Sequence, residues 1–156
     1  MTILFWSKVL MRVTFESQQI VFTWWEALRT RWYKLNMNGG VDMRSGSAIA
    51  GGIVRSYQGD WVVGYGRNIG VSSILEAELR AIVDGLETAW EKGVRQLLIE
   101  SDSRTAVDQI LGAKMVGLPR LASEVHNWIS RDWQVDWRFD MYHEHQIWLL
   151  MLYTRQ

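Results

Sequence analysis

The chain has 156 residues, a formal net charge of zero at pH 7 and no cysteine, and 48% of its residues are hydrophobic. This composition predicts one globular domain, excludes disulfides and thiolate metal sites, and argues against a broadly cationic nucleic-acid binder. It leaves open an enzyme that meets phosphates through metal ions. Because neither a membrane-length apolar run nor a signal-peptide pattern is present, we expect an intracellular protein without a transmembrane segment.

The first 30 residues show no clean helical or strand period. Here and just beyond, Trp24, Trp25 and Trp32 are interleaved with Arg29 and Arg31. Interleaved aromatic and basic side chains can stack bases and hold phosphates. Because only composition supports that function, we interpret residues 1–30 as an N-terminal extension or linker.

Three strands joined by short turns are expected next, over residues 34–40, 48–57 and 61–65. Short turns join neighbouring strands, so the three strands predict an antiparallel meander. The paired glycines Gly51 and Gly52 lie inside the second strand, where the missing side chains would let another backbone come close.

A helix is predicted over residues 74–92, closed by Gly93. At about 100° per residue, Glu78 lies near the edge of its apolar stripe in the first turns, and Glu76 flanks the other side. Either carboxylate could reach past the sheet edge, and the alternative is a solvated glutamate that stabilises the helix N-terminus. The stripe consists of Leu75, Leu79, Ile82, Val83, Leu86 and Trp90.

An unbroken apolar run, residues 97–99, predicts a strand covered on both faces. Asp102 follows it, and Ser103 is a good N-cap for the next helix. Asp102 is thereby placed at the carboxyl end of a buried strand, where sites collect in open α/β sheets. The alternative is that Asp102 or Ser103 only caps the helix.

The remaining elements are a loop, a helix and a strand. The loop covers residues 114–119, and the helix covers residues 121–133. Val135, Trp137 and Phe139 alternate with polar residues and predict the final strand.

The segments KLNMNGG, LEAELRA and LLIESDS follow one another at spacings that resemble the ribonuclease H domain. The resemblance runs from about residue 32 to residue 144, and it is to the plant form found in reverse-transcriptase-like and retroelement-derived proteins. It implies an α/β fold in which helices flank a mixed five-stranded sheet, with three antiparallel strands followed by parallel ones. We therefore expect the domain to cover residues 31–144.

The resemblance also implies hydrolysis of the RNA strand of RNA–DNA hybrids with two Mg²⁺ or Mn²⁺ ions, by a monomer. The family's acidic ligands fall on Glu78 and Asp102, whereas its first-strand aspartate falls on Asn38. An amide keeps an oxygen ligand but loses the charge that makes a carboxylate a strong one. Asp42, past the glycines, is an unsuitable replacement.

The family's last acidic residue should follow Glu144, but residues 145–156 (HQIWLLMLYTRQ) contain none. A one-base change of reading frame after Glu144 would restore a family-like ending, and we interpret the apolar tail as frame-shifted or divergent. Sequencing the gene at this point tests the frame change. If no reading frame gives a family-like acidic ending, the frame change is refuted.

Two functions remain open from the sequence. The first is a hybrid-cleaving ribonuclease impaired by its incomplete acidic set. The second is a catalytically defective, nucleic-acid-binding remnant of a retroelement. A protein-interaction module built on the Trp-rich N-terminus has only composition to support it.

Overall fold

The computed structural model describes residues 30–110 and 119–139. The predicted N-terminal extension (residues 1–30, apart from residue 30), the apolar tail and most of the predicted loop lie outside the described residues. Among the helices of these two ranges, none combines the length and the apolar character that crossing a membrane requires.

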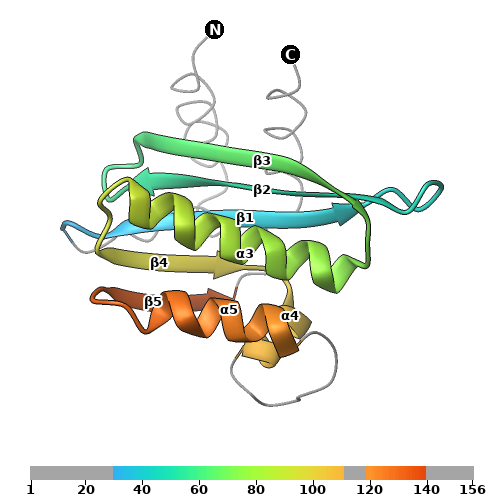
Figure 1. The fold of residues 1–156 in the computed structure, drawn as a ribbon. Coiled ribbons are helices and arrows are strands. Elements are labelled where there is room, and N and C mark those ends of the chain that lie inside the picture. Colours follow the sequence, from blue (N-terminus) through green and yellow to red (C-terminus); the bar gives the residue numbers. More distant parts are fainter. Residues whose placement is uncertain (1–29, 111–118, 140–156) are drawn as a thin grey trace, which may run out of the picture.

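A five-stranded mixed sheet forms the centre of the domain, in the order β3-β2-β1-β4-β5 (Figure 1). The strands β1, β2 and β3 pair antiparallel, whereas β1 pairs parallel with β4, and β4 pairs parallel with β5. This confirms the predicted fold class, with three antiparallel strands followed by parallel ones. The bounds are β1 Tyr33–Val41, β2 Ser47–Ser56, β3 Trp61–Val71, β4 Gln96–Ser101 and β5 Gln134–Phe139.

Helix α3 (Ile74–Glu91) crosses one face of the sheet, and α5 (Pro119–Ile129) lies beside it (Figure 1). The hydroxyl of Ser73 accepts a hydrogen bond from the backbone N–H of Glu76 and so caps α3. The short helix α4 (Arg104–Ile110) follows β4. The core lies between the sheet and these helices and includes Leu35, Met37, Leu79, Ile82, Leu86, Leu97, Ile99, Ile110 and Val125.

One predicted strand is too short. Strand β3 continues to Val71, because the backbone beyond Tyr65 still pairs with the first half of β2. Arg67 and Asn68 in this extension are exposed and polar. The sequence there shows no apolar alternation from which a strand could be predicted.

The helix predicted over residues 121–133 is misplaced, because α5 ends at Ile129. The chain then turns, and the indole N–H of Trp133 donates to the carbonyl of Trp128 at 2.9 Å. Trp133 is therefore half-buried although it lies in a turn after α5. In the sequence, its apolar side chain continues the helical pattern, which is why the predicted helix is too long.

Candidate active site

Asn38 lies near the end of β1, opposite Gly51 of β2, and is only 4% exposed. Along β1, Leu35, Met37 and Gly39 alternate with polar residues, and Gly39 faces α3. Because side chains alternate along a strand, Asn38 points to the other face of the sheet.

Gly39 brings β1 into direct contact with the start of α3. A Cβ at this position would overlap the backbone of Ala77 and Glu78. Only a residue without a side chain therefore permits this approach. As a result, Glu78, which is 6% exposed, lies against β1 at Gly39, the residue that follows Asn38.

We expect Gly39→Ala to lower the free energy of unfolding by about 1–3 kcal/mol, because the added methyl group forces α3 away from β1. Urea denaturation measures this loss. Gly66→Ala is the matched control, since a Cβ there meets its nearest neighbour at 3.8 Å. The control should stay within about 0.5 kcal/mol of the parent, and equal stability of the two variants would contradict the close approach.

Asp102 follows β4 directly and is partly buried. The last parallel pair between β1 and β4 joins Asn36 to Glu100. Asn38 lies two residues further along β1, and Asp102 lies one residue past the end of β4, so both positions are near the carboxyl edge of the sheet. The cap of α4 is Ser103, whose hydroxyl accepts from the backbone N–H of Ala106 at 3.2 Å.

The two alternative acidic residues differ from Glu78 and Asp102. Asp42 is exposed, and its carboxylate accepts from the backbone N–H groups of Arg44 at 2.8 Å and Ser45 at 3.4 Å. It therefore stabilises the turn between β1 and β2. Glu76 is partly buried, and its position two residues before Glu78 in α3 places it on a different side of the helix.

A buried polar network lies beside these residues, and sequence reasoning missed it. The carboxylate of Glu100 accepts from Lys34 Nζ at 2.6 Å and from Asn36 Nδ2 at 2.8 Å, and Arg138 lies 3.6 Å away. Burial lowers the pKa of Arg55, and the charge of Glu100 opposes that shift. One signal in the sequence could have indicated this network: Lys34 and Asn36 alternate with apolar residues in a strand that the structure places at the centre of the sheet.

On the α3 side of the sheet, the hydroxyl of Tyr65 donates to the carbonyl of Ala81. Burial, followed by the charges of Asp84 and Glu78, raises the pKa of Tyr65 well above its usual value of 10.0. A Cβ on Gly52 would lie 2.5 Å from this hydroxyl. Gly52, one of the paired glycines, therefore admits the Tyr65 hydroxyl and the β1 backbone, as expected for a close approach.

The donor set of Asn38, Glu78 and Asp102 consists of oxygen atoms only, which suits Mg²⁺ or Mn²⁺. It contains two carboxylates. Across residues 30–110 and 119–139, no group of three or more His, Asp or Glu side chains could hold a metal ion. The three residues therefore offer the oxygen ligands that such a cation prefers, but fewer anionic ones than the resemblance implies.

Comparison with known proteins agrees with this architecture. The model of the reverse transcriptase-like family matches residues 36–143. A curated Arabidopsis thaliana protein, named provisionally as a ribonuclease H protein, is 34% identical over 117 residues. The match covers 71% of this chain and 18% of that protein, so the chain spans less than a fifth of the curated relative.

Solved structures share the fold. Ribonuclease H1 from Halobacterium salinarum has a TM-score of 0.67 at 21% identity, covering 71% of this chain and 86% of that one. The N-terminal ribonuclease H domain of a Mycobacterium tuberculosis protein gives 0.68 at 20%, covering 74% and 86%. A compost-derived ribonuclease H1, solved in complex with an RNA/DNA hybrid, gives 0.66 at 16%, covering 74% and 89%.

These identities are low enough that the structural likeness shows the fold alone. The family model, in contrast, matches well over half of the chain, from β1 to beyond β5. The chain thus belongs to the reverse transcriptase-like family and is a ribonuclease H-like domain.

Proposed function

We propose that this domain binds RNA–DNA hybrids and hydrolyses their RNA strand with divalent metal ions, at a rate lowered by the amide at position 38. The observation that carries the proposal is the meeting of three segments at one sheet edge. The β1–β4 pairing ends at Asn36 and Glu100, two residues before Asn38 and Asp102, and Gly39 brings the backbone of Glu78 against β1. Support comes also from the family match and from the solved neighbour that holds an RNA/DNA hybrid.

In this proposal, Glu78 and Asp102 are the anionic metal ligands, and Asn38 adds an amide oxygen. A pair of bound Mg²⁺ or Mn²⁺ ions would supply a nucleophilic water and stabilise the leaving oxygen. Burial of Glu78 and Asn38 holds their oxygen atoms in fixed positions and keeps competing water away. The carboxylates repel one another unless cations neutralise them, which makes the site dependent on metal. We propose a monomer, since one chain carries all three residues.

The test is cleavage of an RNA–DNA hybrid labelled on its RNA strand, with Mg²⁺ or Mn²⁺ and with EDTA. We expect slow cleavage that requires metal and falls at least about a hundredfold in Glu78→Gln, because metal ions contribute several kcal/mol of transition-state stabilisation. Glu76→Gln is the matched control and should retain the parent rate. Cleavage that persists in Glu78→Gln would refute the assignment of the site.

The second candidate function is a nucleic-acid-binding domain without catalysis, and Asn38 is the observation that favours it. Loss of one anionic ligand weakens the site for a hard cation, whose affinity depends on ligand charge. The same assay separates the two functions. A hybrid that binds the protein without being cut under any metal condition supports the second candidate.

A further inference from the structure

A second candidate site lies at the opposite edge of the sheet from Asn38. A surface pocket of about 520 Å³ is formed where β1, β4 and β5 begin, between Tyr33, Gln96 and Gln134. Tyr33 and Asn38 are roughly 16 Å apart along β1, at about 3.3 Å per residue. The pocket is therefore separate from the proposed nuclease site.

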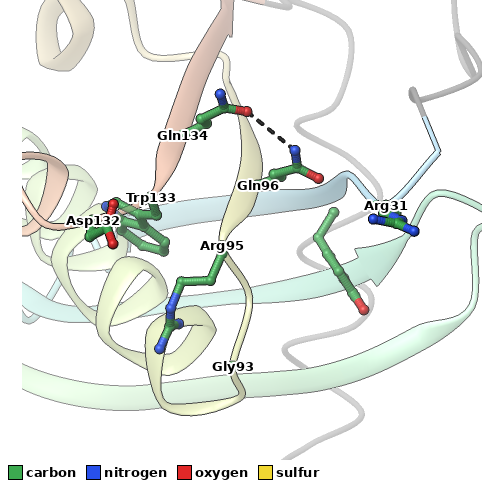
Figure 2. A pocket seen from close by; sticks show the side chains of 8 residues that line it. Arg31, Gly93, Arg95, Gln96, Asp132, Trp133 and Gln134 are labelled. Atoms are coloured by element: carbon green, nitrogen blue, oxygen red, sulfur yellow. Dashed lines mark hydrogen bonds between the residues drawn. The ribbon is translucent and has the colours of Figure 1, made fainter.

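Two arginines give the pocket its positive charge. Arg31 is exposed, and no hydrogen bond or ion pair joins its guanidinium to any other residue that the structure describes. Its backbone φ of 73° is uncommon for a residue with a side chain, and such conformations concentrate at functional positions. Figure 2 shows Arg31 on one side of the pocket and Arg95 on the other.

Arg95 is held in place by its neighbours. Its guanidinium stacks 3.7 Å above the ring of Trp90, and Nη1 donates to the carbonyls of Trp90 and Val94. These contacts use one of the three guanidinium nitrogens. Nε and Nη2 can therefore donate to an anion without a large loss of side-chain freedom.

Trp133 supplies a rigid aromatic wall beside Arg95. Its indole N–H donates to the carbonyl of Trp128, and its ring meets Trp90 edge to face at 5.3 Å. Arg131 stacks on Trp128 at 3.7 Å and adds a third positive charge near this wall. A fixed aromatic ring beside arginines is suited to stacking a nucleobase next to its phosphate.

Two amides complete the pocket. Gln96 Nε2 donates to Gln134 Oε1 at 3.2 Å, a bond drawn in Figure 2. This bond leaves Gln96 Oε1 as an acceptor at one end of the amide pair and Gln134 Nε2 as a donor at the other. Amide acceptors and donors of this kind can each bond the polar edge of a nucleobase.

We propose that this pocket binds a nucleotide, with its base against Trp133 and the two amides and its phosphate between Arg31 and Arg95. The nucleotide could be free in solution or be one unit of a single strand, since both present the same base and phosphate. The carboxylate of Asp132, which also lines the pocket, can accept a hydrogen bond from a sugar hydroxyl.

Binding is measured with the full-length chain in EDTA, so that metal at the other edge makes no contribution. Adenosine monophosphate, adenosine and inorganic phosphate are compared by equilibrium dialysis. A short fluorescent single-stranded RNA is measured by anisotropy. We expect the monophosphate or the RNA to bind at least about tenfold more tightly than adenosine or phosphate, because stacking and charge act together.

The variants locate the binding. Arg31→Gln should raise the Kd of the nucleotide or RNA about five- to tenfold and leave adenosine binding unchanged. In the RNA titration it should also reduce the slope of log K against log salt by about 0.7, the value for one lost phosphate contact. Gln134→Glu, at an exposed position, should weaken binding by repulsion. Arg120→Gln, on the exposed surface of α5, is the matched control and should bind like the parent.

Tight binding of the monophosphate identifies a free nucleotide, and tight binding of the RNA alone identifies a strand. Either result supports the proposal. Phosphate binding as tight as that of both the monophosphate and the RNA overturns it, as does a Kd unchanged by both Arg31→Gln and Gln134→Glu. A glutamate-rich peptide that binds more tightly than the RNA would overturn it in favour of a protein ligand.

Discussion

Asn38→Asp should strengthen divalent-metal binding at least about tenfold and raise hybrid cleavage by a similar factor. In the proposed site, the substitution adds a third carboxylate to those of Glu78 and Asp102, at a position only 4% exposed. Opposite unit charges about 4 Å apart attract by about 4 kcal/mol at an effective dielectric constant of about 20. Repulsion among the carboxylates offsets part of this gain, and tenfold requires only about 1.4 kcal/mol.

The same substitution should destabilise the domain when metal is absent. Three close carboxylates repel, so we expect a loss of about 1 kcal/mol in EDTA, or a few degrees in Tm. Saturating Mg²⁺ should reverse the loss, because a ligand at a hundred times its Kd stabilises the folded state by about 2.7 kcal/mol. Thermal unfolding with and without Mg²⁺ therefore reports metal binding independently of cleavage.

Asn68→Asp is the matched control for this experiment. Asn68 lies exposed on β3, and its side-chain oxygen accepts from the backbone N–H of Gly70 at 2.8 Å, which a carboxylate can also do. It makes the same chemical change away from the proposed site. A metal-dependent Tm shift of equal size in both variants would show that Mg²⁺ acts on surface charge and not at position 38.

The fold was predictable because its elements are locally encoded. The stripe on α3, the serine cap before it and the apolar run of β4 each mark an element within a few residues. The position of Glu78 followed in the same way from the helical angle. The antiparallel strands were predictable from the short turns, whereas the parallel ones came only from the resemblance of three motifs, because a local pattern cannot specify the partner of a parallel strand.

Two features lay beyond the sequence pattern. Trp133 continues the apolar face of α5 in the sequence, yet its indole N–H bonds the Trp128 carbonyl from a turn. The partner of Lys34 is Glu100 on another strand. Nothing near Lys34 in the sequence indicates burial with a carboxylate, because their proximity follows from the parallel pairing of β1 and β4.

Glu100→Gln should lower the free energy of unfolding by about 3–5 kcal/mol, the largest loss expected from a single substitution here. The side chains of Lys34 and Glu100 are 2% and 3% exposed. Removing the carboxylate leaves the ammonium group of Lys34 buried without this counter-charge, and Arg138 also loses its nearby anion. The amide can still accept from Asn36, so the variant isolates the charge. Urea denaturation at neutral pH measures the loss.

An exposed ion pair supplies the control for Glu100→Gln, and a double variant tests its cause. Asp108→Asn removes the charge from the exposed Arg104–Asp108 pair at 3.8 Å and should cost less than about 0.5 kcal/mol. Lys34→Met combined with Glu100→Gln should recover part of the loss, because no buried ammonium group then lacks this partner. The coupling energy from this cycle measures how strongly the pair holds β1 to β4, four residues before Asn38 and two before Asp102. A coupling near zero would mean that the pair does not fix the register on which the proposed site depends.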